Sequence, residues 1–236
     1  MPAQSIDNIS SRILFEDNHL IVINKLAGEI VQGDKTGDQP LLDLVKNYIK
    51  IKYQKPGEVF LGLVHRIDRP VSGAVIFAKT SKALSRMTQL IKNRDFVKIY
   101  LAITDVLPPV GEQLLKNYLK KNEAANKSVV VRSESDGGKL AELTFIHRAS
   151  GNTIHLLEVN LHTGRHHQIR AQLAAAGLPI RGDVKYGAKR ANKDGSIDLH
   201  AYKLIFKHPV GGKEIVIIAA PPKTPEWNAF SSWSGT

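Results

Sequence analysis

The sequence predicts an α+β fold with a largely antiparallel or mixed sheet, a central cleft and flanking helices. Its 236 residues suffice for one large domain or two small ones, and an apolar content of 42% suits a globular core. Short apolar runs typical of strands outnumber the helical patterns, and turn signals separate several of them. No tract rich in proline, glycine and serine divides the chain. We therefore expect a loose polar tail over residues 1–11 and a single domain over residues 12–236.

The N-terminal region predicts a strand pair followed by a helix. Ile13–Lys25 has the pattern of two short strands around an Asp17-Asn18 turn. Apolar residues then recur at helical spacing over Leu41–Ile51, directly after Pro40, which favours a helix start.

A polar loop between two apolar runs is the centre of the pattern. Val59–Val64 leads into the loop and Ala74–Ala78 leads out of it, and both runs have the composition of buried strands. Within the loop, Asp68 stands between Arg66 and Arg69. A loop anchored in the core at both ends can fix a carboxylate in place. Spacing alone is equally compatible with a surface turn and an incidental salt bridge.

The middle of the chain predicts a second helix and four strands. Thr80 or Ser81 can cap the helix. Its apolar face consists of four residues at helical spacing: Ala83, Met87, Leu90 and Ile91. The strands are expected over residues 95–104, 128–132, 140–145 and 153–161. Asp136-Gly137 predicts a hairpin between the second and third of these, whereas Pro108–Lys127 has no clear periodicity.

Histidines and arginines gather where a strand is expected to meet a helix, at Leu161–Leu173. Gly164 permits a sharp entry, and the helix should run to Ala176. Its buried stripe should consist of Ile169, Leu173 and Ala176. His166 and Arg170, four residues apart, would share another face.

A zinc site is conceivable because histidines occupy positions 162, 166 and 167. Adjacent residues of a helix diverge by about 100°, which suits a shared metal poorly. Two nearby arginines would also repel a cation. We therefore predict no metal.

Composition narrows the class of function. The chain has no cysteine, which excludes disulfides and thiol nucleophiles, and no apolar stretch long enough for a transmembrane helix. It also lacks a secretory signal pattern, so we expect a cytoplasmic protein. The formal net charge is +11, and residues 61–236 carry the whole excess with 26 basic and 14 acidic residues. This distribution favours a nucleic-acid partner over a basic surface that only aids solubility.

The polar loop resembles a known catalytic signature. His65–Arg69, followed by Ser72-Gly73 and Phe77–Lys79, is similar to the H-R-L-D-R-x-T-S-G signature of the RluA-type pseudouridine synthases. Ile67 replaces the leucine of that pattern, which is a conservative change. Val71 replaces its threonine, so a hydroxyl is absent at this position.

Further motifs of the same family follow in order. The chain resembles the motifs N-K-P-A-G, K-x-Y-x-A, T-G-R-x-H-Q-[IL]-R and G-x-P-[IL]-x-G-D-x-x-Y-G at residues 24–28, 98–102, 163–170 and 177–187. Leu26 stands where the first motif has proline. Many relatives carry an S4 RNA-binding domain ahead of this motif; only about a dozen residues separate the strands from the start of this chain, so we expect none here.

The resemblance implies the pseudouridine synthase fold and the isomerisation of specific uridines in structured RNA, ribosomal or transfer, to pseudouridine. Nothing enters or leaves in that reaction, so no cofactor is implied. Asp68 would be the nucleophile, Tyr100 would border the target base, and Arg170 would be the cation beside Asp68. Whether the carboxylate attacks the base or the ribose stays open.

The resemblance also implies base flipping, because chemistry on a base requires its removal from the stack. Arg66 would occupy the vacated space. Other RNA contacts are expected from His65, Arg69, Arg165, His167, Gln168, Arg181 and Lys185. We expect a monomer without an obligate protein partner and without membrane association.

Two other functions remain compatible with the sequence. An inactive RNA-binding module of the same fold would not need Asp68, Tyr100 and Arg170 together. A hydrolase that uses Asp68 as a general base would normally need a second carboxylate or a metal. The sequence does not indicate which RNA or which uridine is modified.

Overall fold

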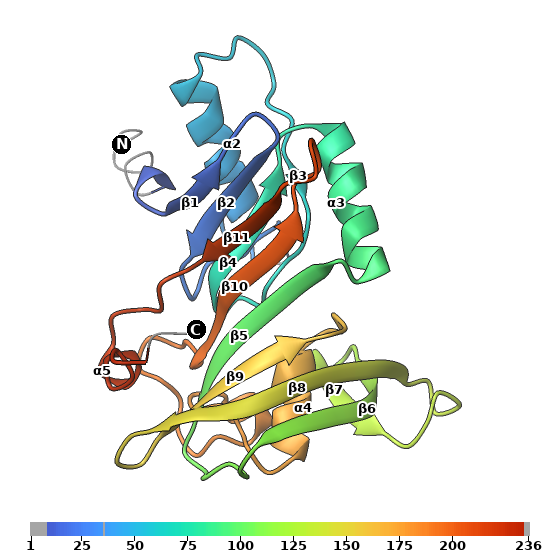
Figure 1. The fold of residues 1–236 in the computed structure, drawn as a ribbon, viewed down its shortest axis with the longest axis vertical. Helices are drawn as coiled ribbons and strands as arrows, with labels where there is room; N and C mark the ends of the chain where they lie inside the picture. The colour runs from blue at the N-terminus through green and yellow to red at the C-terminus, as the bar shows by residue number, and fades with distance from the viewer. Residues whose placement is uncertain (1–8, 35, 234–236) are drawn as a thin grey trace. The chain divides into compact units, whose positions relative to one another are not determined.

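The computed structural model describes residues 9–34 and 36–233, which divide into two compact units. Unit 1 comprises the chain up to Phe96 together with Ala201–Ala220. Unit 2 comprises Val97–His200 and the chain from Pro221 onward. Figure 1 labels the helices and strands of both units.

The expected single domain over residues 12–236 stays a prediction, as does the central cleft. Most of the expected tail, residues 1–8, lies outside the described part of the chain. Ile9, at its end, is buried, and its carbonyl oxygen accepts a hydrogen bond from the Arg12 N–H at 3.0 Å. Within residues 9–34 and 36–233, no helix is long and apolar enough to cross a membrane.

Among its described residues, unit 1 contains a sheet together with the helices α2 and α3. Its elements are β1 (Ile13–Glu16), β2 (Leu20–Lys25), α2 (Leu41–Lys52), β3 (Gly62–Leu63), β4 (Ser72–Ala78), α3 (Ser81–Asn93), β10 (Leu199–Lys207, from Ala201 onward) and β11 (Glu214–Ile218). The strand order is β1-β2-β4-β10, with β11 beside β10 and β3 beside β4. The pairs β1–β2, β2–β4, β3–β4 and β10–β11 are antiparallel, in agreement with the expected sheet type.

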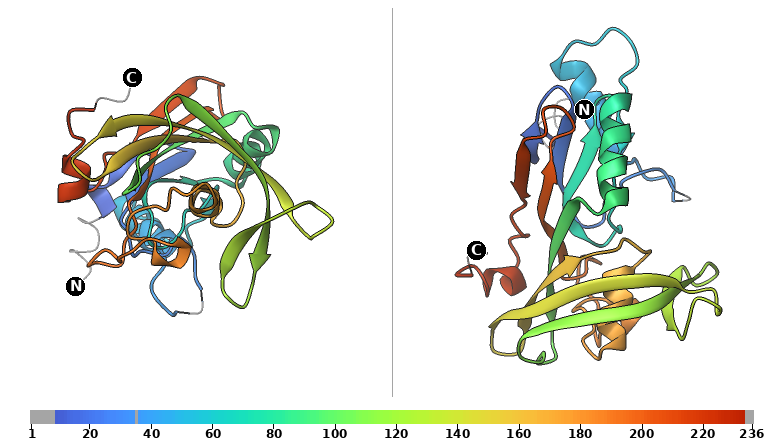
Figure 2. Two further views of the ribbon diagram at one scale, coloured as in Figure 1. Left: turned by 90° about the horizontal axis from the view of Figure 1, so that it is seen from below. Right: turned by 45° about the vertical axis from the view of Figure 1, so that its right-hand side comes forward.

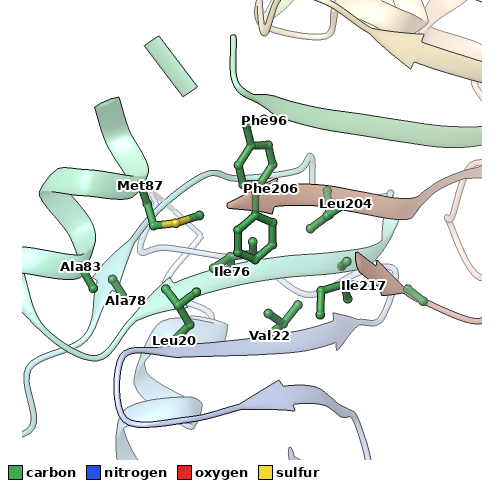
Figure 3. Close-up of a cluster of buried hydrophobic side chains, with 12 residues drawn as sticks. Leu20, Val22, Ile76, Ala78, Ala83, Met87, Phe96, Leu204, Phe206 and Ile217 are labelled. Atoms are coloured by element: carbon green, nitrogen blue, oxygen red, sulfur yellow. The ribbon is translucent and has the colours of Figure 1, made fainter. Parts of the chain in front are cut away.

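The core of unit 1 lies between its sheet and α3 (Figures 2 and 3). Leu20 of β2, Ile76 of β4 and Met87 of α3 are fully buried there. The rings of Phe96 and Phe206 stack with their centroids 5.3 Å apart. Each buried aliphatic side chain contributes about 1.5–3 kcal/mol, so this cluster fixes α3 against the sheet.

Several local predictions for unit 1 are confirmed. Asp17 Oδ1 accepts hydrogen bonds from the N–H groups of His19 and Leu20, which closes the turn between β1 and β2. Thr80 Oγ1 accepts from the Ala83 N–H and caps α3. The buried strand expected over Val59–Val64 is wrong in extent, because only Gly62–Leu63 pairs with β4 and Phe60 is 48% exposed.

Unit 2 is a curved antiparallel sheet around a short helix (Figure 2, left). Its elements are β5 (Phe96–Thr104, from Val97 onward), β6 (Glu112–Asn122), β7 (Lys127–Val131), β8 (Lys139–Ser150), β9 (His155–Leu161), α4 (Gln168–Ala175), the 3-10 turn η1 (Val184–Tyr186) and α5 (Pro225–Asn228). The strand order is β5-β9-β8-β6-β7, and every neighbouring pair is antiparallel.

The structure differs most from the prediction in the region without periodicity, residues 108–127. Glu112–Asn122 is strand β6, and it pairs with β7 on one side and β8 on the other. The hairpin expected at Asp136-Gly137 is therefore wrong, since β7 and β8 are separated by β6. The turn residues do form a turn, with the Gly137 N–H donating to the Glu134 carbonyl oxygen.

The helix after β9 starts later than expected. Gln168 is its first residue, and His167 before it has a left-handed backbone with φ of 50°. His166 and Arg170 therefore do not share a helical face. Ile169 and Leu173 are buried as predicted, whereas Ala176 is exposed and lies beyond the last helical residue.

Candidate active site

The Asp68 loop of unit 1 connects β3 to β4. Its two ends join strands that pair with each other, with Leu63 opposite Phe77. The side chain of Ile67, before Asp68, is buried, whereas Asp68 itself is partly exposed. The Val71 N–H donates to the Asp68 carbonyl oxygen at 3.0 Å and closes a turn. Asp68 therefore sits on a short segment that the core fixes at both ends.

Lys25 forms a hydrogen bond that holds the C-terminal part of this loop. Its side chain is fully buried at the end of β2, and Nζ donates to the carbonyl oxygens of Leu26, Glu29 and Arg69 at 2.8–3.1 Å. The Gly28 N–H donates to the same Arg69 carbonyl oxygen. Burial lowers the pKa of Lys25 to about 8, against the opposing negative charges of Glu29 and Asp68. A buried lysine thus ties the motif at residues 24–28 to the loop that carries Asp68.

Two of the three departures from the family pattern, Val71 and Leu26, have a local explanation. Val71 is buried, so its side chain lies in the core of unit 1. Leu26 is half exposed, and its N–H donates to Glu29 Oε2, a hydrogen bond that proline could not make. Glu29 also forms a salt bridge with Arg12 at 2.8 Å, so a second interaction holds this turn.

Gly73 is required at the start of β4. Its φ is +118°, and a Cβ atom at this position would lie 2.4 Å from the Ala201 carbonyl oxygen. No side chain fits there, because β4 and β10 approach each other closely at this point. The glycine of the signature therefore has a backbone role.

The polar residues around Asp68 differ in exposure. Arg66 is exposed, as its expected role in the RNA requires. Arg69 pairs with Asp38 at 2.7 Å, and both side chains are about half exposed. His65 Nε2 accepts a hydrogen bond from the Ile76 N–H, and its ring lies 5.8 Å from that of Phe96. His65 therefore braces the loop against β4.

In unit 2, Tyr100 lies on β5 opposite Val159 of β9 and is 6% exposed. Lys98 lies on the same face of the strand, and burial lowers its pKa. The alternation expected for Lys98 and Tyr100 is thus present in the strand.

Arg170 has a buried carboxylate partner that sequence reasoning missed. Its Nε and Nη2 donate to the two carboxylate oxygens of Asp183 at 2.6 and 2.9 Å. Both side chains are almost completely buried. The Tyr186 ring lies 5.0 Å from Arg170 Cζ. Asp183 and Tyr186 belong to the G-D-x-x-Y-G motif, so the motif marked their place but not their partner.

Two histidines precede α4 in a stacked arrangement. The rings of His166 and His167 lie 3.8 Å apart at an angle of 20°, which corrects the divergence expected from a helix. The Tyr186 hydroxyl accepts a hydrogen bond from the Ser128 N–H at 2.8 Å, and it shares a second hydrogen bond of 3.0 Å with His167 Nδ1. Burial and then the Arg170 charge lower the pKa of His167 to about 2, which keeps the ring neutral.

A metal-ligand role for these histidines finds no additional support. Across residues 9–34 and 36–233, no group of three or more histidine, aspartate or glutamate side chains could hold a metal ion.

Other residues expected to contact RNA have partners within unit 2. Gln168 is buried, and its amide bonds Thr163, the Arg165 N–H and the Glu142 carbonyl oxygen. Arg165 Nε donates to the Leu140 carbonyl oxygen, although the side chain is exposed. Gln168 therefore shapes the turn before α4.

Arg181 is surrounded by acidic groups. It lies within 3.5 Å of Asp105, Asp198 and Glu226, and the hydrogen bond to Asp105 raises its pKa. Lys185 is exposed and donates to the Asn126 carbonyl oxygen at 3.2 Å. Arg181 thus has carboxylate partners, whereas the contact of Lys185 in the described part of the chain is with a carbonyl oxygen.

Comparisons with known proteins agree with these motifs. Residues 19–175 match the family described as RNA pseudouridylate synthase. A ribosomal large subunit pseudouridine synthase C from Buchnera aphidicola is 35% identical over 90% of this chain and 68% of the relative. An uncharacterised RNA pseudouridine synthase from Bacillus subtilis is 34% identical over 89% of this chain and 68% of the relative.

A solved structure, that of the human RNA pseudouridylate synthase domain containing 4, covers 94% of each chain with a TM-score of 0.74 and 25% identity. This likeness confirms the predicted fold. The chain therefore belongs to the RNA pseudouridylate synthase family and is an isomerase that makes pseudouridine in RNA.

Proposed function

We propose that this enzyme converts specific uridines of large-subunit ribosomal RNA to pseudouridine, with Asp68 as the nucleophile. The anchored Asp68 loop carries the proposal, because both of its ends and the Arg69 carbonyl oxygen are fixed by strands and by Lys25. The names of relatives from several bacteria support the substrate class. Transfer RNA is the alternative substrate that the test below distinguishes.

The reaction breaks the bond between ribose C1′ and uracil N1 and forms a bond between C1′ and C5. The C5 proton leaves and N1 gains a proton, so atoms balance without a further reactant. A carboxylate can act as the nucleophile in such a step and form a covalent intermediate. Asp68 takes this role at either the base or the ribose.

The remaining site residues act around this nucleophile. Arg170 donates hydrogen bonds to the ionised carboxylate, for which a guanidinium fork is suited. Tyr100 borders the target base. Arg66 enters the space left by the flipped base, and the other exposed cations of the predicted set, Arg69, Arg165 and Lys185, contact phosphates.

The enzyme acts as a monomer in the cytoplasm in this proposal. Size-exclusion chromatography with light scattering should give the mass of one chain, about 26 kDa. A stable dimer would remove this part of the proposal and leave the chemistry in place.

Pseudouridine mapping of total RNA tests the proposal. Cells that lack the gene should lose pseudouridine at defined uridines of large-subunit ribosomal RNA, and wild-type protein should restore it. Asp68→Asn keeps the shape and removes the nucleophile, so it should bind the RNA with near-normal affinity and restore nothing. Loss confined to transfer RNA would refute the substrate class, and full restoration by Asp68→Asn would refute the nucleophile.

An inactive RNA-binding module is not favoured. It would require neither the buried Arg170–Asp183 pair nor the anchored Asp68 loop, and the named relatives are synthases.

A further inference from the structure

We infer that Asp183 is a positioning residue for Arg170: it sets the direction in which the Arg170 guanidinium donates hydrogen bonds in the reaction. The inference rests on the proposed function, in which Arg170 acts on the Asp68 carboxylate. It concerns a residue that the sequence alone left without a role.

The contact between the two side chains is bidentate. Arg170 Nε donates to Asp183 Oδ2 at 2.6 Å, and Nη2 donates to Oδ1 at 2.9 Å. A guanidinium has five N–H bonds in one plane, and this pair uses two of them along one edge. With that edge fixed, the plane of the group is fixed too. The three N–H bonds that Asp183 does not engage then have set directions.

The backbone at Asp183 is fixed in a turn. The Asp183 carbonyl oxygen accepts from the N–H groups of Tyr186 and Ala188, both at 3.0 Å, and the Asp183 N–H donates to the Ile180 carbonyl oxygen. Gly182 before it has φ of +83°, and a Cβ there would lie 2.7 Å from the Asn192 side chain. The chain therefore holds Asp183 in a turn with little freedom, and Tyr186 covers one face of the guanidinium.

The pair also changes what Arg170 supplies. A buried carboxylate 2.6 Å away offsets the positive charge of the guanidinium. Arg170 then contributes chiefly through the direction of its N–H donors rather than through net charge. Lysine at this position keeps a charge but cannot bond Asp183 in two places and donate elsewhere in the same plane.

The test separates rate from binding. Asp183→Asn keeps the side-chain shape and replaces one acceptor oxygen by an amide group that repels the arginine donors. We expect the single-turnover rate on a verified RNA to fall about tenfold to a hundredfold, as activity does when a residue that orients a metal ligand is removed. RNA affinity should stay unchanged. Arg170→Lys should reduce the single-turnover rate by as much as Asp183→Asn does, because the retained positive charge does not replace the directed N–H donors.

Glu158→Gln is the matched control. Glu158 pairs with Arg148 at 2.7 Å on β9, so the same carboxylate-to-amide change faces an arginine in the same unit. Its rate should equal that of the wild type. A folded Asp183→Asn variant with the wild-type rate would overturn the inference, as would a loss confined to RNA affinity.

A double variant keeps the inference testable if Asp183→Asn fails to fold. Arg170→Ala leaves Asp183 buried without this partner, and Arg170→Ala with Asp183→Asn removes that charge as well. The double variant should be more stable than Arg170→Ala and have the same low rate, because Asp183 acts through Arg170. A further drop in rate would show that Asp183 acts independently. Failure of the proposed function is recognised separately, since the wild type itself would then form no pseudouridine.

Discussion

Lys25 gives the sharpest quantitative prediction. The pKa of this buried side chain is lowered from 10.5 to about 8, chiefly by burial. Between these pH values the folded chain has released the proton and the unfolded chain keeps it. The unfolded state then binds more protons, so the free energy of unfolding rises with pH by about 1.4 kcal/mol per pH unit in this interval.

The total gain above the folded-state pKa is about 3 kcal/mol, since the shift spans about 2.5 pH units. Lys25→Met removes the titrating group. The wild type should therefore gain about 2 kcal/mol more than the variant between pH 7.5 and pH 10. Urea unfolding curves at several pH values in this range measure the difference directly, because titrations of other residues cancel.

Two comparisons make this prediction refutable. Lys92→Met, at an exposed position of α3, controls for the loss of one charge and should show no such pH-dependent difference. Equal destabilisation by Lys25→Met at pH 7.5 and pH 10 would refute the reasoning. It would mean that the three carbonyl oxygens keep Lys25 charged despite its burial.

The other predictions concern RNA and the backbone. The excess of positive charge over residues 61–236 should make RNA affinity fall about tenfold or more between low and physiological salt; affinity independent of salt would contradict phosphate contacts. Arg66→Ala should reduce activity on structured RNA more than on a short single strand, and equal losses would place Arg66 in the loop or the chemistry. Gly73→Ala should lower the free energy of unfolding more than Gly28→Ala does in chemical denaturation, because both glycines have positive φ but only Gly73 has no room for a Cβ atom. The positive φ alone should cost about 1–3 kcal/mol in each variant. Equal losses would show that β10 can move away from Gly73.

Sequence reasoning predicted the elements whose signals are local. The Asp17 turn, the Thr80 cap and the strand Ala74–Ala78 depend on neighbouring residues, and the structure confirms them. Strand β6 was missed because its apolar residues do not alternate with polar ones: Leu114 and Leu115 are adjacent, and Leu114 is 58% exposed. Its pairing with β7 is a local hairpin, in which Asn122 faces Lys127, whereas its pairing with β8 joins residues as far apart as Glu112 and Ile146.

In the candidate site, too, local motifs were recognised from the sequence and contacts between distant residues were not. The motifs marked Asp68, Tyr100 and Arg170, and their assigned roles stay predictions. The bidentate pair of Arg170 with Asp183 spans 13 positions and a change of direction, so no periodicity could indicate it. The start of α4 was placed too early because no sequence pattern indicated the left-handed backbone at His167, which directly precedes the helix.

Strand β4 has a consequence for local opening of the enzyme. All seven of its residues are buried, and it lies between β2, β3 and β10. We therefore expect its amide hydrogens to exchange with solvent only when unit 1 unfolds cooperatively, which native-state hydrogen exchange would measure. The Asp68 loop joins directly to this strand, so its C-terminal end belongs to the slowest-exchanging part of the unit.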